Sequence, residues 1–455
     1  MHLILLSGGS GKRLWPLSND IRAKQFLKLL ENPFGNKESM VQRVWRQLND
    51  DRIKDLWKSI TIAASESQQE QLKIQLNQKF DIVTEPERRD TFPAIALACS
   101  FLYSEKDVNL EDNVIILPID PYVEIDYFYK LLTIKQELEK THADLILLGT
   151  RPLFPSEKYG YIVPEDSLKS ESLFRITKFV EKPKKEVAEL LIKQNALWNC
   201  GVFGMQLKYI LNMLKEKYQF HDINYHYVKE HFCNLPQNSF DYEVVEQAHN
   251  IRALEYVGPW KDLGTWETIT EEIKKPIAGN ALLSKSCKNT HIINELETPI
   301  IAMGIENAII AASYDGILVA NKGETYQLKE LISDVDNRPM YEECWWGKYI
   351  ILDYCKTENN ETLTKKLIIS SGKQTSYQYH RYRKEIWTIV SGEGILYLNG
   401  KKKKVYSGDT IIIGYGEKYG IYACSPLEII EVQWGTPLLE EDTIRLELEW
   451  DPNLN

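Results

Sequence analysis

The first residues of the chain hold side chains suited to binding an anion. An apolar run, residues 3–6, leads into a loop that combines glycines with cations. Glycines let backbone N–H groups approach an anion closely, and cations neutralise its charge. The residues that we expect around a phosphate are Gly8, Gly9, Ser10, Gly11, Lys12, Arg13 and Lys24. The sequence therefore predicts a phosphate site at the end of the first strand.

Two well-known phosphate loops do not match this segment. The P-loop needs Ser or Thr after its Gly-Lys pair, but Arg13 follows Lys12. The dinucleotide-binding loop needs a third glycine where Leu14 stands. Taken alone, the segment also fits an ordinary turn after a strand. Its interpretation therefore depends on the motifs that accompany it along the chain.

Two further segments carry charges suited to a nucleotide. Arg88 and Arg89 lie in a loop before an apolar helix, and a planar guanidinium can bond nucleobase edges or phosphates. Asp120 follows the apolar run 114–117, which puts it at the carboxyl end of a buried strand. A carboxylate there can hold Mg²⁺, which prefers hard oxygen ligands. Taken alone, the arginines also fit an exposed loop, and Asp120 also fits a turn or a helix cap.

Length and composition limit the class of protein. A chain of 455 residues can hold two or three domains, and 43% hydrophobic residues suffice for their cores. The net charge of −10 argues against a general nucleic-acid or membrane-surface binder. The sequence has no long apolar span and begins without a basic leader. Seven cysteines without a Cys-x-x-Cys pair indicate reduced thiols, so we expect a cytoplasmic protein.

The elements that must position these residues change in character along the chain. Over residues 1–275, short apolar runs (3–6, 59–64, 114–117 and 145–149) alternate with amphipathic stretches such as 39–48 and 65–80. Continuous apolar runs are typical of strands buried on both faces. The alternation predicts an α/β domain with a mostly parallel sheet, whose ligands bind beyond the carboxyl ends of the strands.

The remainder of the chain is rich in β-branched residues. Residues 276–338 carry short strand-like runs without long helices, and we predict a small β-rich segment, a partial β-solenoid. Residues 339–440 are strand after strand, with Asn399-Gly400 as a hairpin turn, and predict an all-β barrel. Residues 441–455 are expected to form a C-terminal tail.

The opening segment resembles a family signature. The string Ser7-Gly-Gly-Ser-Gly-Lys-Arg-Leu-Trp-Pro-Leu-Ser18, with Lys24-Gln25-Phe26, is similar to that of sugar-phosphate nucleotidyltransferases, most closely mannose-1-phosphate guanylyltransferases. The family usually has Thr at Lys12 and Pro at Ala23. Other family-like stretches follow in family order: Glu85–Ala96, Leu117–Asp120, Tyr159–Ile162, Phe179–Pro183, Trp198–Phe203, Ser239–Tyr242 and Trp260–Trp266. The family more often has Asn at Asp90 and His at Pro121.

The resemblance implies a role for each matching residue. It implies a Rossmann-like nucleotidyltransferase domain in which Arg13 and Lys24 are catalytic and Mg²⁺ is held by Asp120 and Asp262. The nucleotide would meet Gly8, Gly9, Ser10, Gly11, Lys12, Arg88 and Arg89. The sugar phosphate would meet Gly160, Glu181, Lys182 and Asn199. Glu181 can accept hydrogen bonds from sugar hydroxyls, and Lys182 can meet the phosphate charge.

The C-terminal region resembles a cupin metal barrel, and in particular the phosphomannose isomerase domain of bifunctional guanylyltransferase/isomerase enzymes. The first half of the cupin pattern keeps its spacing with Gln378, His380 and Glu385 as ligands, but Tyr419 replaces the usual fourth histidine. A neutral phenol is a poor ligand for Zn²⁺ or a similar metal. Three interpretations stay open: a working isomerase, a metal-free barrel kept for structure or assembly, and an altered sugar-binding or regulatory module. We expect the isomerase activity to be lost.

The resemblance implies transfer of a nucleotidyl group from a nucleoside triphosphate to a sugar 1-phosphate. The expected reaction is GTP plus mannose 1-phosphate to GDP-mannose plus pyrophosphate, with a homodimer as the assembly. The nucleophile is already an anion, so catalysis should be positioning and charge neutralisation. Alternatives are another sugar, such as a heptose or fucose 1-phosphate, and a non-catalytic sugar-nucleotide sensor. The joint presence of Arg13, Lys24, Asp120, Lys182 and Asp262 speaks against the sensor.

Overall fold

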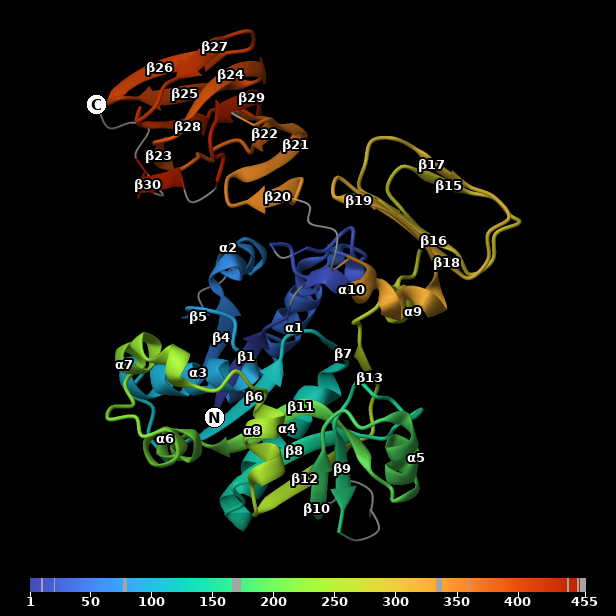
Figure 1. Cartoon of the computed structure of the whole chain (residues 1–455). Helices are drawn as coiled ribbons and strands as arrows, with labels where there is room; N and C mark the ends of the chain where they lie inside the picture. Colours follow the sequence, from blue (N-terminus) through green and yellow to red (C-terminus); the bar gives the residue numbers. More distant parts are fainter. Residues whose placement is uncertain are drawn as a thin grey trace. The chain divides into compact units, whose positions relative to one another are not determined.

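The computed structural model divides the chain into two compact units (Figure 1). The first comprises residues 1–13 and 23–274, and the second comprises residues 14–22 and 275–455. The residues that the structure describes are 1–9, 11–19, 21–76, 80–165, 173–332, 338–358, 360–439, 442–447 and 450.

A twisted, mostly parallel sheet forms the centre of the first unit, as predicted. Its strands lie in the order β5-β4-β1-β6-β11-β8-β12-β10-β9 (Figure 1). The parallel strands are β1 (His2–Ser7), β4 (Ser59–Ser65), β5 (Asp81–Glu85), β6 (Asn113–Pro118), β8 (Leu145–Thr150) and β12 (Ile251–Tyr256). The antiparallel strands are β9 (Tyr161–Pro164), β10 (Phe174–Val180) and β11 (Leu197–Gln206). The sheet thus opens its ligand-binding edge at the carboxyl ends of β1, β6 and β12.

Helices cover both faces of this sheet. Ile4 packs into a core with α3 (Thr91–Glu105), α6 (Leu207–Glu216) and α7 (Tyr225–Glu230). Its neighbours Leu3 and Leu5 point to the other face, against α1 (Met40–Leu48), α2 (Glu66–Gln75) and α4 (Ile125–Thr141). Each such fully buried side chain contributes roughly 2 kcal/mol. Burial on both faces explains why the strands are continuous apolar runs. The other helices are α5 (Lys185–Lys193), α8 (Phe240–Glu243) and α9 (Trp266–Glu272).

The second unit begins with short strands that stack in parallel from one chain turn to the next. One sheet joins β14 (Ile277–Ala278), β16 (His291–Asn294) and β18 (Ala308–Ser313), with β19 (Gly316–Asn321) antiparallel at its edge. A second sheet pairs β15 (Ala281–Leu283) with β17 (Ile300–Ala302). Helix α10 (Leu328–Leu331) follows. Parallel stacking of successive coils is the geometry of the predicted partial β-solenoid.

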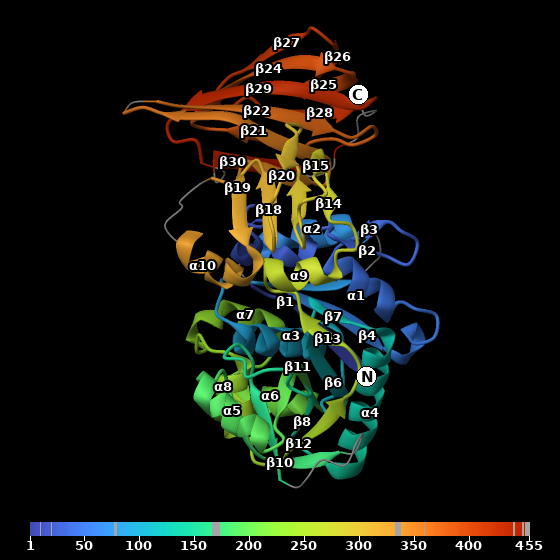
Figure 2. The same ribbon diagram turned by 90° about the vertical axis from the view of Figure 1, so that its right-hand side faces the viewer.

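The rest of the second unit is an antiparallel β structure made of two sheets (Figure 2). One contains β20 (Tyr341–Cys344), β21 (Gly347–Lys356), β22 (Glu361–Ile369), β29 (Leu427–Gly435), β24 (Arg383–Ser391) and β27 (Thr410–Ile413). The other contains β26 (Lys401–Tyr406), β25 (Glu393–Leu398), β28 (Tyr419–Ala423), β23 (Tyr377–His380) and β30 (Thr443–Glu447). Asn399 and Gly400 turn β25 into β26 with φ values of 50° and 79°, as a two-residue hairpin requires. β30 lies in the segment that the sequence assigned to the tail, and it pairs with β23.

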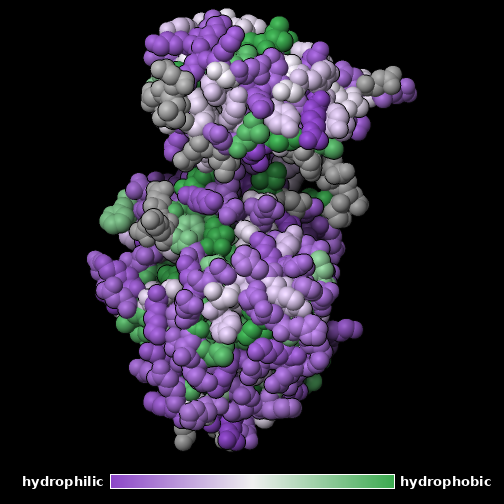
Figure 3. All heavy atoms as spheres, turned by 90° about the vertical axis from the view of Figure 1, so that its left-hand side faces the viewer, coloured by the Kyte–Doolittle hydropathy of each residue, from purple (hydrophilic) through white to green (hydrophobic). Residues whose placement is uncertain are grey.

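The surface drawn in Figure 3 is mostly hydrophilic, with small scattered apolar patches. This agrees with a chain in which 26% of the residues are charged. All seven cysteines carry free thiols. Across the part of the chain that the structure describes, no helix combines the length and the apolar character needed to cross a bilayer.

Candidate active site

Lys24, Asp120 and Asp262 form the most compact cluster of predicted site residues. The Lys24 ammonium Nζ lies 2.9 Å from Asp120 Oδ2 and 3.1 Å from Asp262 Oδ1. The three side chains are 13%, 24% and 30% exposed, so the cluster is only partly hydrated. Residues 238 positions apart along the chain therefore meet at the predicted edge of the sheet.

Two local features bring these side chains together. β7 (Pro121–Val123) pairs antiparallel with β13 (Trp260–Asp262), and the register places Asp262 opposite Pro121, directly after Asp120. Lys24 begins a short 3₁₀ turn whose next residue, Gln25, donates to Ser7 Oγ at 3.3 Å at the end of β1. Pro121 has no N–H to offer, but it stands at the end of a short two-strand ladder, where a missing donor is tolerated.

The charges of this cluster stabilise one another. Burial favours the neutral form of Lys24, but the two carboxylates outweigh it and raise the Lys24 pKa above its ordinary value. Burial likewise opposes ionisation of Asp262, yet Lys24 and then Arg13 lower its pKa. Arg13 also acts on the Tyr159 hydroxyl, whose pKa is raised by burial and by Asp262. The exposed Arg13 therefore belongs to the same electrostatic site.

The two carboxylates fit a divalent cation. They converge on one cationic atom, Asp120 from directly before β7 and Asp262 from the end of β13, and Mg²⁺ is usually held by one or two carboxylates together with substrate phosphate oxygens. Gly264 lies against the Asp262 carboxylate, since a Cβ there would come within 3.1 Å of both oxygens. Asp120 and Asp262 are thus the residues that would hold the cation.

The glycine loop has the backbone that the sequence predicts. Gly9 adopts φ = 114°, a region that favours glycine, and both Gly8 and Gly9 are exposed. Gly11 begins a 3₁₀ turn that carries Lys12 and Arg13. Ser10 lies outside the described residues. The loop is open to an anion, which leaves its predicted phosphate role as a proposal.

A second cluster unites the residues predicted to meet the sugar. Gly160 lies so close to Glu181 that a Cβ would sit 2.5 Å from its carboxylate. Asn199 donates its backbone N–H to the Gly160 carbonyl at 2.8 Å, and Lys182 pairs with Glu181 at 2.6 Å. Lys182 adopts φ = 44°, an unusual conformation for a residue with a side chain. Such strain is often found where a side chain is held for function.

Asp241 joins this cluster although it was not among the predicted site residues. It accepts from Asn199 Nδ2 at 2.8 Å. Burial, followed by the nearby Glu181 charge, raises the pKa of Asp241 to about 7. The signal was in the sequence, since Ser239–Tyr242 resembles a family stretch. Tyr159 was not among the predicted site residues either. The centre of its ring lies 4.9 Å from that of Trp198, beside Asn199, and 5.4 Å from that of Trp260, in the strand that ends at Asp262.

The two predicted nucleotide-binding arginines differ in their surroundings. Arg89 donates to the Leu235 carbonyl at 3.0 Å and pairs with Glu87 at 2.5 Å, so its guanidinium holds two loops together. Arg88 acts instead on Glu85, whose pKa burial raises to about 7. A carboxyl group with a pKa near 7 is protonated part of the time, so it can donate a hydrogen bond as well as accept one. Glu85 therefore joins Arg88 as a candidate contact to a nucleobase.

The chain between Arg13 and Ala23 belongs to the second unit. Arg22 makes a bidentate pair with Glu295 at 2.7 and 2.9 Å, and its guanidinium lies 5.3 Å from the centre of the Tyr341 ring. Asn19 donates to Asp315 at 2.7 Å, and Ser313 donates to the Pro16 carbonyl at 2.6 Å. The ends of this segment lead directly to the two predicted catalytic cations.

The predicted cupin ligands also come together, but around a phenol rather than an open centre. The Tyr419 hydroxyl lies 2.6 Å from His380 Nε2, 3.3 Å from Gln378 Nε2 and 2.7 Å from Glu385 Oε2. The buried Arg383 guanidinium lies 3.3 Å from the same His380 nitrogen and 3.6 Å from Glu385.

A hydroxyl and a cation therefore stand where a metal would bind, and this donor set does not fit one. Within the described residues there is no group of three or more His, Cys, Asp or Glu side chains arranged to hold a metal.

Comparison with known proteins agrees with this architecture. Residues 2–277 match the nucleotidyl transferase family, and residues 319–448 match the mannose-6-phosphate isomerase C-terminal family. A protein of Vibrio cholerae named putative mannose-1-phosphate guanylyltransferase is 28% identical over 98% of this chain and 99% of its own. A mannose-1-phosphate guanylyltransferase of Salmonella montevideo is 28% identical over 99% of both chains.

A solved structure shares the fold. The crystal structure of a protein from Thermus thermophilus, titled mannose-1-phosphate geranyltransferase, has a TM-score of 0.61 at 23% identity, covering 74% of this chain and 99% of its own. The family match spans more than half of the chain and includes every predicted residue of both clusters in the first unit. The chain belongs to the nucleotidyl transferase family.

Proposed function

We propose that the protein transfers a guanylyl group from GTP to mannose 1-phosphate, forming GDP-mannose and pyrophosphate. The observation that carries the proposal is the meeting of Lys24 with Asp120 and Asp262 at the carboxyl edge of the sheet. The names of the full-length relatives support the choice of GTP and mannose 1-phosphate.

The residues of the first unit divide the work between two substrates. The glycine loop and Arg13 would bind the triphosphate, with Arg88 and Glu85 at the base. The sugar hydroxyls would exchange hydrogen bonds with Glu181, Asn199 and Asp241. Lys182 would bind the sugar phosphate. That phosphate oxygen attacks the α-phosphorus in line, the bond to pyrophosphate breaks, and no general base is needed because the nucleophile is already an anion.

Charge neutralisation is the main catalytic task in this proposal. Arg13 and Lys24 face the negative charge that builds on the transferred group, in a partly dehydrated site where such contacts are strong. Mg²⁺ held by Asp120 and Asp262 would add the charge of a divalent cation shared with the phosphates. Position and charge together account for the activity without a covalent intermediate.

A matrix of nucleoside triphosphates against sugar 1-phosphates tests the proposal through pyrophosphate release. GTP with mannose 1-phosphate should give the highest kcat/KM. A higher kcat/KM with a heptose or fucose 1-phosphate would identify that sugar phosphate as the substrate instead. Arg13→Ala should lower turnover by roughly two to four powers of ten. Nucleotide binding without any pyrophosphate release would favour a sensor and contradict the transferase.

We also propose a homodimer formed through the solenoid. Large apolar side chains of its strands are strongly exposed: Leu282 64%, Ile301 65%, Ile317 60% and Val319 65%. Exposed apolar side chains gathered on one segment are typical of interaction surfaces. Light scattering should give twice the mass of 52.9 kDa, and Leu282→Glu with Ile301→Glu should give the monomer mass. A wild-type monomer would contradict this assembly.

A further inference from the structure

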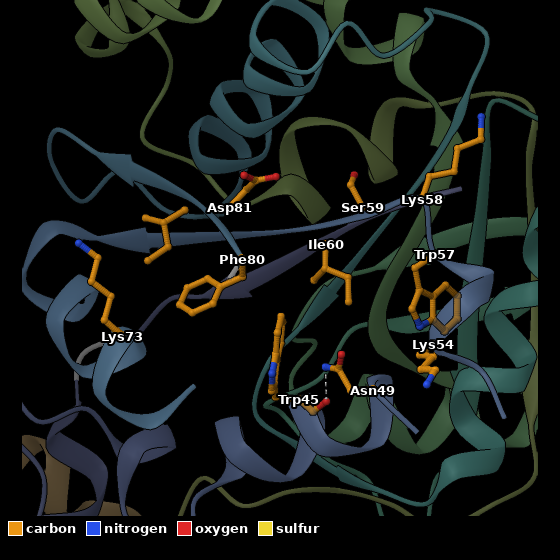
Figure 4. A pocket seen from close by; sticks show the side chains of 11 residues that line it. Trp45, Asn49, Lys54, Trp57, Lys58, Ser59, Ile60, Lys73, Phe80 and Asp81 are labelled. Atoms are coloured by element: carbon orange, nitrogen blue, oxygen red, sulfur yellow. Dashed lines mark hydrogen bonds between the residues drawn. The ribbon is translucent and has the colours of Figure 1, made fainter. Parts of the chain in front are cut away.

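A cavity of about 610 Å³ in the first unit contains none of the predicted active-site residues (Figure 4). Ser59 and Ile60 line it at the start of β4, where Ser59 pairs with His2, the first residue of β1. The glycine loop follows Ser7, at the other end of the same two strands. The cavity therefore lies at the amino ends of the strands, opposite the candidate active site.

The charge of this cavity contrasts with that of the chain. Its charged lining residues are Lys54, Lys58, Lys73 and Asp81, a net charge of +2, whereas the whole chain carries −10. Asp81 is paired with Lys106 at 2.6 Å. Lys54 pairs with the exposed Asp51 and Lys58 with the half-buried Asp112; the two lysines themselves are 46% and 61% exposed, and ion pairs of exposed lysines are worth only about 0–1 kcal/mol. Both ammonium groups can therefore exchange these partners for a bound anion.

Aromatic side chains line the middle of the cavity. Figure 4 shows Trp45 and Phe80 between Lys73 at one end and Lys54 and Lys58 at the other. The Trp45 and Phe80 rings meet edge to face at 5.5 Å. Trp45 is 9% exposed, and its indole N–H has no hydrogen-bond partner among the described residues.

We propose that this cavity is a second, non-catalytic binding site for a nucleoside phosphate. The base packs against Trp45 and Phe80, and the phosphates lie at the end of the cavity that Lys54 and Lys58 line. Free phosphate would leave the aromatic half empty, and an uncharged ring would leave the lysines without an anion. The volume falls in the range of about 300–1,000 Å³ that small-molecule sites occupy.

One helix connects this site with the candidate active site. α1 contributes Trp45 to the cavity, and its Arg43 and Gln47 both donate to the Val123 carbonyl, at 3.2 and 2.9 Å. Val123 ends β7, the strand that begins directly after Asp120. A ligand that shifts α1 would act on the segment that begins directly after a proposed metal ligand, Asp120, and we expect such an occupant to change the rate of transfer.

Equilibrium dialysis with labelled GDP, ADP and UDP tests the site on the full chain. At least one of these should bind at two sites per chain in the wild type. Lys54→Glu/Lys58→Glu should weaken one site at least roughly tenfold, the scale of lost charge-assisted hydrogen bonds. Lys285→Glu/Lys288→Glu is the matched control, because these exposed lysines carry the same charge change in the second unit. It should keep both sites.

The outcomes separate this inference from the proposed function, on which only its regulatory role rests. Arg13→Ala/Lys24→Ala should keep the cavity site and lose the other. The inference would be overturned if the wild type bound only one nucleotide per chain and Arg13→Ala/Lys24→Ala abolished that binding. It would also be overturned if Lys54→Glu/Lys58→Glu kept both sites. If the wild type shows no transferase activity but binds a nucleotide that Lys54→Glu/Lys58→Glu loses, the cavity site is supported and the proposed function is contradicted. A kinetic response to the nucleotide that persists in Lys54→Glu/Lys58→Glu would overturn the regulation.

Discussion

Lys24→Met tests the shared electrostatics of Lys24, Asp120 and Asp262 directly. Each carboxylate contact, at 2.9 and 3.1 Å, corresponds to roughly 5 kcal/mol of Coulomb attraction at an effective dielectric constant of about 20. Desolvation offsets most of this attraction. Removing one partner of a buried pair costs about 3–5 kcal/mol, because it leaves charge uncompensated. Since the carboxylates are 24% and 30% exposed, we expect a loss of about 2 kcal/mol.

Thermal melts at pH 7.5 in EDTA measure this loss. For a unit of this size, 1 kcal/mol corresponds to roughly 2–4 °C, so the transition of the first unit should fall by about 4–8 °C. Adding Mg²⁺ should raise the transition of Lys24→Met more than that of the wild type, because the lysine no longer competes for the carboxylates. Lys28→Met, which removes an exposed lysine four residues further along, is the control and should behave as wild type.

Equal Mg²⁺ shifts in Lys24→Met and the wild type would refute a metal site shared with this lysine. Equal melting temperatures in EDTA would refute the electrostatic reasoning itself, since two converging carboxylates should not tolerate the loss of their only cation at hydrogen-bond distance among the described residues. Both readouts are independent of substrate turnover. They therefore test the site even if the sugar is not mannose.

Three further predictions concern other parts of the chain. Because the pKa of Asp241 is raised to about 7, its protonated form stabilises the fold at pH 5, and this contribution is lost as pH rises through 7; Asp241→Asn should reduce the fall in melting temperature between pH 5 and 8, and Glu85 should account for part of the remaining fall. Glu295→Gln removes the charged pair with Arg22, which holds the segment between Arg13 and Lys24. We expect kcat to fall roughly tenfold with little change in KM, because these two cations are then less well positioned. Zinc-treated protein should retain far less than one zinc per chain by mass spectrometry and should not isomerise mannose 6-phosphate, whereas stoichiometric zinc would contradict the arrangement around Tyr419.

The elements of the first unit could be predicted because their signals are local. Each predicted strand is a run that is buried on both faces, and such a run has few other ways to satisfy its environment. α1 begins where Ser39 caps it, as the amphipathic stretch from residue 39 indicates. α2 ends at Gln75, earlier than the stretch to residue 80, and its polar composition gives no clear apolar stripe to mark that end. The hairpin at Asn399 followed from turn chemistry alone.

Non-local chemistry was harder to predict. The resemblance pointed to Asp262, but its approach to Lys24 depends on the register of β13 against β7, which no local pattern encodes. Asp241 acquires its raised pKa from burial beside Glu181. Arg383 lies two residues before Glu385 in the same strand, so both face the barrel interior; its contact with His380 is visible only once the strands are paired. Contacts between charged residues that are distant in the sequence therefore cannot be predicted from the spacing of residues along the chain.

Residues 14–22 belong to the second unit, and they connect Arg13 with the segment that carries Lys24. The second unit can therefore contribute to the proposed reaction even if it catalyses no reaction itself. If Arg13 and Lys24 are to be in place before the substrate arrives, the segment between them must be ordered, which costs backbone entropy. Leu14 and Leu17 are buried, and the bidentate Arg22–Glu295 pair holds the end of the segment within the second unit. Arg13 and Lys24 then leave the two ends of a segment already held in place. Retention of a barrel whose interior does not fit a metal is explained if its unit is needed to hold the segment of residues 14–22.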